Sequence, residues 1–359
     1  MLKKLLALIA AALIPLTTHA SEITYDIGGE FRANYGYIDT AERYSRNSND
    51  YKSFAYAELN FSAEYELDDE TSFGLYLDVM KNFNRSTRTL NNGSWGKEVY
   101  GIANTAYGRV LLGETYNVAD QFHQGPKNIL HPTNFLTNRN WNRKENRVHY
   151  KTLNSTSINT DGVAPKVTYI SPAFYDTYFG VSYINNINNR RGLANKHLSY
   201  SDNDGYVVSA YNELDLGYFD AYSSLSYANF RDDDKEYSAS LKLKRGNWSI
   251  SSGYRKAYID GNKDPIASDL SDNYREGYAW NVGVEYEIGP FSSSLTYLNS
   301  KAKNTDNEDK IVTFSNKYQL NKWADIYLGA AHVDYQGEDN DPKKSNKGYI
   351  VMTGIGLSF

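Results

Sequence analysis

The sequence predicts an all-β protein, a transmembrane antiparallel β-barrel of 16 strands with an inward-folded third loop. Apolar and polar residues alternate with a period of two along most of the chain. After the first twenty residues, no segment approaches the apolar length of a membrane-spanning helix. Tyrosine occurs 33 times, beside 26 glycines and only 8 prolines, although the mean hydropathy is low. Strands that face lipid on one side and water on the other, with aromatic girdles, have this composition.

The N-terminus predicts an export signal over residues 1–20, which leaves residues 21–359 for the barrel. Lys3 and Lys4 precede an apolar core, and Thr18-His19-Ala20 forms a cleavage site of small residues. The apolar core is shorter than the ~20 residues that a membrane span needs. We therefore expect cleavage after Ala20 and localisation in the bacterial outer membrane.

Charge and cysteine content exclude some classes of partner and some sources of stability. Without the signal, the mature chain carries 36 basic and 43 acidic residues, which argues against nucleic acid as a partner. The chain has no cysteine, so an exported form must be stable without disulfides.

Alternation predicts the strands in order. Residues 23–39, 54–67 and 72–83 alternate clearly, and residues 98–106 and 109–116 follow as the fourth and fifth strands. The seventh strand covers 177–185, and the last covers 347–359. Four further strand pairs meet at short turns near residues 214–217, 245–247, 289–290 and 320–322. The sixth strand is ambiguous, because residues 146–152 and 165–171 both alternate and a polar segment separates them.

Connection lengths indicate a membrane barrel. Short turns alternate strictly with longer polar segments at 39–52, 84–97, 117–145, 186–204, 229–236, 259–273, 300–309 and 336–346. Short periplasmic turns, long outer loops and an even number of strands are typical of outer-membrane barrels. Closure also removes the exposed edges of a large sheet.

The longest irregular stretch is the third outer loop, residues 117–145. Long loops without secondary structure are uncommon and are often functional. This one is rich in cations, with Lys127, Arg139, Arg143 and Lys144 against Asp120 and Glu145. We expect it to fold into the lumen as the constriction.

Three short stretches carry a family resemblance. Tyr56-Ala57-Glu58-Leu59, followed by Phe61, resembles a second-strand motif usually written Y-A-R-L-x-F. Residues 98–114 resemble a hairpin written G-L-x-x-x-x-G-x-x-x-x-G-R, with Gly101, Gly108 and Gly113 in place. The last strand, with Tyr349, Leu357 and the terminal Phe359, resembles the signal read by the barrel-assembly machinery. The chain is similar to the Gram-negative general porins, which are trimeric channels for passive diffusion.

The resemblance implies a charge pattern from which this sequence departs. In enteric porins, basic residues on the wall face acidic residues on the third loop. Here Glu30, Glu58 and Glu114 stand at wall positions that are usually basic, whereas Arg147 keeps a family arginine. The loop carries cations in place of the usual acidic motif. We therefore expect a constriction of reversed polarity; alternation supports an inward Glu58, whereas the position of Glu114 rests on the resemblance alone.

The predicted constriction combines loop and wall residues. They are Glu30, Arg32, Glu58, Glu114, Asp120, Lys127, Arg139, Trp141, Arg143, Lys144 and Arg147. Opposed charges across a narrow aqueous gap create a transverse field. The predicted function is passive diffusion of small hydrophilic solutes and ions. The alternative is a sugar-selective porin in which Trp141 and lumen aromatics stack on sugar rings.

We expect no enzyme, metal site or cofactor. His123 and His131 lack a carboxylate at ligand spacing, and among the remaining histidines of the mature chain, His149, His197 and His332, none accompanies a recognisable nucleophile. The expected partners are outer-membrane lipid and lipopolysaccharide, the solutes themselves and, by resemblance, two further copies of the chain.

Overall fold

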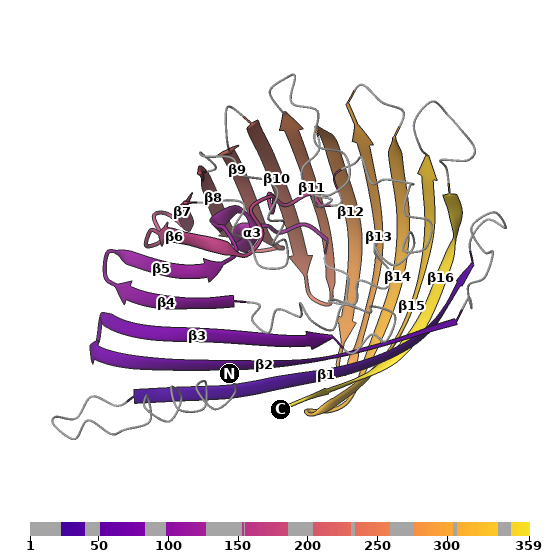
Figure 1. Ribbon diagram of the computed structural model, residues 1–359, viewed down its shortest axis with the longest axis horizontal. Helices are drawn as coiled ribbons and strands as arrows, with labels where there is room; N and C mark the ends of the chain where they lie inside the picture. Colours follow the sequence, from indigo (N-terminus) through magenta and orange to yellow (C-terminus); the bar gives the residue numbers. More distant parts are fainter. Residues whose placement is uncertain are drawn as a thin grey trace, which may run out of the picture.

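The computed structural model describes residues 23–39, 51–82, 98–126, 153, 155–185, 204–230, 234–258, 276–303, 307–336 and 346–359. Within these ranges the chain forms one closed sheet of 16 strands (Figure 1). The bounds are β1 Ile23–Asp39, β2 Tyr51–Asp68, β3 Thr71–Asn82, β4 Glu98–Thr105, β5 Gly108–Thr115, β6 Ala164–Ile170, β7 Thr177–Ile184, β8 Gly205–Asp215, β9 Asp220–Phe230, β10 Asp234–Arg245, β11 Trp248–Tyr258, β12 Gly277–Ile288, β13 Phe291–Ala302, β14 Glu308–Asn321, β15 Ala324–Gln336 and β16 Asn346–Ser358.

Each strand pairs antiparallel with its neighbours in sequence, and β1 pairs with β16 to close the barrel. At the seam, the backbone amides of Gly29 and Phe359 each donate to the other's carbonyl oxygen at 3.0 Å. In a closed sheet, the backbone N–H and C=O groups of every strand have partners on a neighbouring strand. A structure that spans a lipid bilayer requires this. The prediction of a 16-stranded antiparallel barrel is confirmed.

The alternation sorts residues between two faces as predicted. On β1, Phe31 and Tyr35 are exposed on the outward face, whereas Arg32 and Asn34 are buried on the inward face. On β12, Trp280 is exposed and Ala279 is buried. The outer surface is therefore apolar and aromatic, and the inner surface is largely polar, as a barrel in lipid requires.

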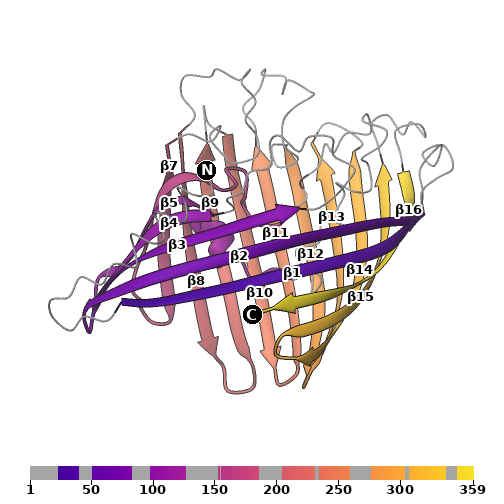
Figure 2. The ribbon, with the colours of Figure 1, turned by 60° about the horizontal axis from the view of Figure 1, so that its bottom comes forward.

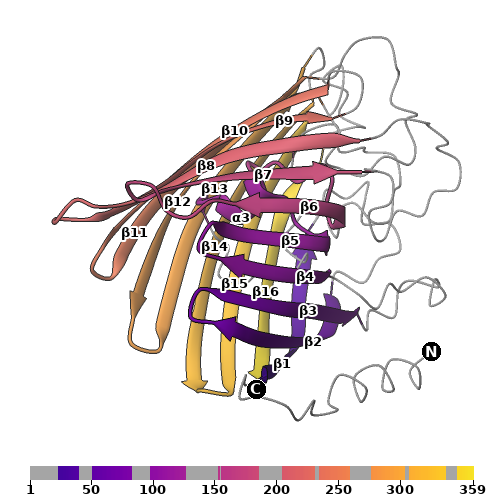
Figure 3. The same ribbon diagram turned by 90° about the vertical axis from the view of Figure 1, so that its left-hand side faces the viewer.

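The short turns lie together at one end of the barrel (Figures 2 and 3). Among them are the connections β2–β3, β4–β5, β8–β9, β10–β11, β12–β13 and β14–β15. The opposite end carries the longer connections. In outer-membrane barrels the end with short turns is usually the periplasmic one.

Two expectations about boundaries change. The sixth strand is β6, Ala164–Ile170, so the assignment near 165–171 is confirmed; the other candidate, residues 146–152, lies outside the described residues. The outer connections expected at 229–236 and 300–309 are shorter. Polar residues such as Glu236 and Ser300 continue the strands, because they occupy inward positions of the ladder. Among the described residues, no helix is long and apolar enough to cross a membrane.

Candidate functional site: the pore constriction

The third loop begins with a short helix, α3, Val118–Phe122. Asn117 caps it: the Asn117 side chain accepts a hydrogen bond from the Asp120 amide at 3.0 Å. The Asn117 amide group also donates to the Ile158 carbonyl at 2.9 Å. The cap therefore starts the helix and ties it to a second segment, residues 155–163.

Helix α3 packs against the inner face of β7, β8 and β9, inside the ring of strands (Figure 1). Its apolar side chains join one buried cluster. The members are Val118, Ala119, Phe122, Ile158, Ala164, Ile184, Val207, Ala228 and Phe230. Gly180 on β7 makes this approach possible, because a methyl group there would overlap the Val118 side chain. The prediction that the loop folds inward is confirmed for residues 117–126.

From the helix, the chain crosses the inner wall toward β12. The Val118 amide donates to Ser182 Oγ on β7 at 2.9 Å, and the Gln124 amide donates to Ser240 Oγ on β10 at 2.8 Å. Pro126 then lies against Gly283 on β12. Small inward residues on these strands leave room for the loop and supply hydroxyl acceptors. Sequence reasoning missed this signal, which is a run of serine, glycine and alanine at inward positions between residues 180 and 283.

A second inward segment, residues 155–163, lies beside the loop. Arg255 on β11 is fully buried; it forms an ion pair with Glu236 of 2.7 Å and donates to Asn159 at 3.0 Å and Thr160 at 2.6 Å. Asp161 and Lys166 form a second ion pair of 2.7 Å with no exposed side-chain surface. Sequence reasoning treated this segment only as a polar interruption near strand six.

Two titratable groups join the loop to this second segment. Asp120 accepts a hydrogen bond from Ser157 Oγ at 2.6 Å, and burial raises the pKa of Asp120. His123 Nε2 lies 2.9 Å from Thr156 Oγ1. Burial, followed by repulsion from Arg255, lowers the pKa of His123 to about 4, so the ring is neutral at pH 7. Asp120, predicted to line the constriction, therefore lies where the loop meets residues 155–163.

The opposite sector of the inner wall is acidic. On β1, Arg32 Nε forms an ion pair with Glu30 Oε1 at 2.9 Å, and Arg32 Nη1 lies 3.6 Å from Asp325 on β15. The Tyr56 hydroxyl also donates to Glu30. The guanidinium carbon of Arg32 lies 5.3 Å from the centre of the Tyr327 ring. The single cation of this group is thus flanked by two carboxylates.

Glu58 belongs to the same inward surface. The register pairs Glu58 on β2 directly with Glu30 on β1. Two carboxylates at opposed positions give this part of the wall an excess of negative charge, and they repel each other. Further inward acids follow on the next strands: Asp78 on β3 and Glu98 on β4, which pair with each other in register.

Glu114 is a correction to the predicted wall. Its register partners are Val99 on β4 and Pro165 on β6, and its parity is that of the exposed Leu112. The ladder therefore places Glu114 on the outward face, whereas Thr115 occupies the inward position. The family resemblance suggested the wall; the alternation with Val110 and Leu112 pointed outward, and the register agrees with the alternation.

The remaining predicted constriction residues, Lys127, Arg139, Trp141, Arg143, Lys144 and Arg147, lie outside the described residues. Within the described ranges, no group of three or more histidine or acidic side chains could hold a metal ion.

At the C-terminus, Tyr349, Leu357 and Phe359 are exposed on the outward face; their role as an assembly signal stays a prediction.

Comparisons with known proteins agree with this architecture. The sequence model of the family described as Gram-negative porin matches residues 7–338. A search of curated proteins finds no match. Among solved structures, Salmonella typhi OmpF in complex with daunomycin is similar at 14% identity and a TM-score of 0.65, covering 93% of this chain and 97% of that one.

Two further barrels are similar over nearly their full length. The anion-selective porin from Comamonas acidovorans has 14% identity and a TM-score of 0.60, covering 94% of this chain and 100% of that one. The trimer form of OmpT, an outer membrane protein of Vibrio cholerae, has 12% identity and a TM-score of 0.60, with coverages of 94% and 99%. The family match extends over most of the closed barrel and the inward loop. The chain therefore belongs to the Gram-negative porins, the outer-membrane channels through which small hydrophilic solutes and ions diffuse passively.

Proposed function

We propose that this porin selects among its solutes with a transverse field whose negative side is the wall of β1 and β2. One observation carries the proposal: Glu30 and Glu58 are paired in register on the inward face. The described part of the third loop lies along β7–β12 and continues into the sequence that holds Lys127, Arg139, Arg143 and Lys144. Cations on that part of the loop would face carboxylates on the wall.

The two carboxylates have different surroundings, which matters for the experiment. Glu30 is held by Arg32 and Tyr56, so neutralising it also disturbs two neighbours. Glu58 is therefore the residue to change. In a water-filled gap, a fixed carboxylate attracts cations and repels anions. Its removal should therefore lower the permeability of cations relative to anions.

The test is the reversal potential of single channels in a KCl gradient across a planar bilayer. We expect Glu58→Gln to shift the reversal potential toward the chloride potential. Glu114→Gln is a matched control, because it removes the same charge from the outward face. An unchanged reversal potential for Glu58→Gln, or an equal shift for both variants, would refute the acidic wall.

We also propose that the channel is a homotrimer, exported with a cleaved signal. The support is the trimer form of the Vibrio cholerae protein, whose fold this chain shares. Closed cyclic symmetry buries one patch of each barrel between copies. Cross-linking in native outer membranes should give a ladder that stops at three, and N-terminal sequencing should begin at Ser21. A ladder that stops at one copy would contradict the trimer.

A second candidate function is sugar selectivity. Tyr76 on β3 and Tyr100 on β4 face the lumen with ring centres 5.0 Å apart, beside Asp78 and Glu98. An aromatic surface next to carboxylates suits a sugar ring, which stacks and donates hydrogen bonds. Saturable block of the ion current by micromolar oligosaccharide would favour this function over general diffusion.

A further inference from the structure

Arg32 is the only cation among the predicted constriction residues that the structure describes, and it lies in the acidic sector of the inner wall. Inward side chains of a porin strand face a water-filled lumen. Nevertheless, only 10% of the Arg32 side-chain surface is exposed. Its guanidinium group is enclosed by neighbouring side chains, and their arrangement determines how much of the charge a solute meets.

Both edges and one face of this guanidinium group have partners. On one edge, Arg32 Nε lies 2.9 Å from Glu30 Oε1, and Nη2 donates a hydrogen bond to Glu30 Oε2 at 3.1 Å. On the other edge, Nη1 lies 3.6 Å from Asp325 Oδ1. The Tyr327 ring covers one face, with its centre 5.3 Å from the guanidinium carbon. Contacts to both oxygens of a carboxylate fix the guanidinium plane, and an aromatic face adds attraction.

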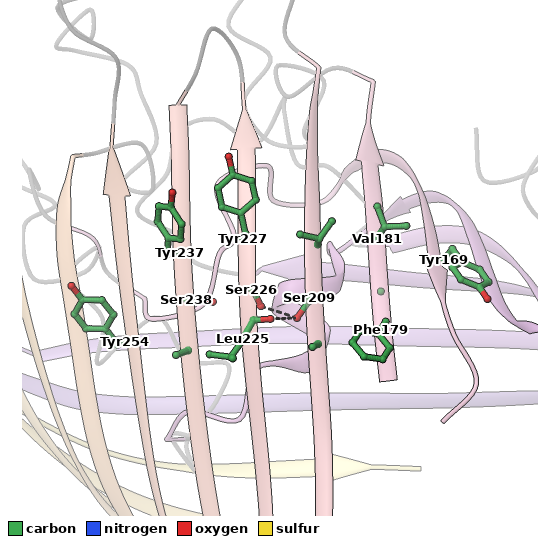
Figure 4. A pocket seen from close by; sticks show the side chains of 14 residues that line it. Tyr169, Phe179, Val181, Ser209, Leu225, Ser226, Tyr227, Tyr237, Ser238 and Tyr254 are labelled. Atoms are coloured by element: carbon green, nitrogen blue, oxygen red, sulfur yellow. Dashed lines mark hydrogen bonds between the residues drawn. The ribbon is translucent and has the colours of Figure 1, made fainter. Parts of the chain in front are cut away.

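The contact with Asp325 skips a strand. Inward contacts commonly join adjacent strands, as Figure 4 shows for Ser209 on β8 and Ser226 on β9, whose hydroxyl oxygens lie 2.7 Å apart. Arg32 on β1 and Asp325 on β15 are instead both paired in register with Gly356 on β16, the strand between them. Two strand spacings, about 10 Å, separate their backbones. The arginine side chain can cross this gap because Gly356 has no side chain: a methyl group there would lie 2.8 Å from an Asp325 carboxylate oxygen.

Tyr327 crosses the same strand one row further along. It is paired in register with Gly354 on β16, and Gly354 is paired with Asn34 on β1. The Tyr327 hydroxyl donates a hydrogen bond to the Asn34 side chain across β16. Only 3% of Tyr327 is exposed, and a methyl group at Gly354 would overlap its ring. The hydroxyl contact therefore fixes the ring where it covers the Arg32 guanidinium group.

We propose that three wall residues form a clamp that withdraws the charge of Arg32 from the lumen. They are Glu30, Asp325 and Tyr327. Because arginine keeps its charge at physiological pH, only its position determines how much of that charge solutes meet. Held in the clamp, Arg32 is balanced by two carboxylates; released, it would present its charge to the lumen beside Glu58. Asp325 and Tyr327 are thus positioning residues for ion selectivity, and the inference rests on the proposed transverse field, whose negative side the clamp preserves.

The first test is a double-mutant cycle with the reversal potential in a KCl gradient as the readout. Tyr327→Leu changes no charge but removes the ring and the hydroxyl that hold Arg32. We expect it to shift the reversal potential toward the chloride potential, because the released cation repels potassium ions. Arg32→Gln should shift it toward the potassium potential. In the Arg32→Gln background, Tyr327→Leu should cause no further shift, because no arginine remains to be released.

The second test measures the accessibility of Arg32 directly. The folded porin in detergent is treated with a small dicarbonyl reagent that modifies guanidinium groups, and mass spectrometry identifies the modified peptides. We expect Arg32 to be protected in the wild type and modified in Tyr327→Leu. Arg109, an exposed inward residue on β5, is the internal control and should react equally in both proteins.

Gly356→Ala tests the role of the intervening strand. The added methyl group should displace Asp325 without a change in charge, so this variant should also shift the reversal potential toward the chloride potential. Gly101→Ala is the matched control, because a methyl group at Gly101 meets nothing closer than 3.8 Å. The mobility of unheated protein in detergent gels verifies that each variant is still a closed barrel.

The clamp is overturned by a wild-type reversal potential for Tyr327→Leu, by the same shift with and without Arg32, or by modification of Arg32 in the wild-type protein. Equal shifts by Gly356→Ala and Gly101→Ala would overturn the role of β16. The clamp and the acidic wall fail separately. If Glu58→Gln leaves the reversal potential unchanged while the cycle shows coupling, only the transverse field is wrong; if Glu58→Gln shifts it and the cycle shows no coupling, only the clamp is wrong.

Discussion

Two parts of the inner wall, β7–β12 and β1–β4 with β15, follow the same alternation but carry different inward side chains. On β7–β12, inward positions such as Gly180, Ser182, Ser240 and Gly283 are small, and the third loop lies directly on them. On β1–β4 and β15, inward positions carry charge and aromatic rings, as Glu30 and Tyr56 do. The difference teaches that side-chain size at inward positions decides where a loop can dock, whereas charge decides what the remaining wall presents to solutes.

The largest expected effect is a loss of stability in the docked half of the barrel, the strands β7–β12 on which the third loop lies. Arg255→Ala leaves Glu236 buried without its ion pair and removes the contacts to Asn159 and Thr160. Breaking a buried pair in this way costs about 3–5 kcal/mol. We expect a lower unfolding midpoint in detergent and noisier single-channel currents. Lys347→Ala, at an exposed pair, should change stability by no more than about 1 kcal/mol; equal effects of the two variants would contradict the contrast.

The next effect is a pH dependence of the docked half. The pKa of His123 is lowered to about 4, so the unfolded chain binds a proton more readily than the folded one between pH 6.5 and pH 4. Stability is therefore retained above this window and lost as the pH falls through it, by about 3 kcal/mol in total. The raised pKa of Asp120 acts in the opposite direction, since its folded form favours the proton.

The measurement is the unfolding free energy between pH 7 and pH 4 for the wild type and His123→Gln. The variant should show a flatter profile, because the remaining acids titrate equally in both proteins. The same slope in both proteins would show that His123 does not contribute.

The smallest effect concerns one methyl group. Gly180→Ala places that group against Val118, whereas the same change at Gly101 on β4 meets nothing closer than 3.8 Å. Overpacking costs about 1–3 kcal/mol. We expect Gly180→Ala to lower the unfolding midpoint and alter the conductance, and Gly101→Ala to do neither. If both substitutions were silent, the close contact between loop and wall would be wrong.

Much of the barrel could be predicted because its signals are local. The period of two, the short turns and the polarity of the connections depend on residues near one another in sequence, and they led to 16 strands and to an inward third loop. The wall acids Glu30 and Glu58 also followed from parity. The position of Glu114 did not follow from the resemblance, because a motif match does not determine which face a residue takes; the ladder does.

The sequence by itself determined the alternation along the strands, the two faces of the sheet and the class of protein. One face of each strand contacts lipid and the other contacts water, so every strand must alternate apolar and polar residues. Only the tertiary structure decided which of two candidates is the sixth strand, that residues 155–163 dock inside the barrel, and that Arg255 holds them there. The Arg255 contacts join residues up to 96 positions apart. Their partners become neighbours only when the barrel closes, so no local pattern records them.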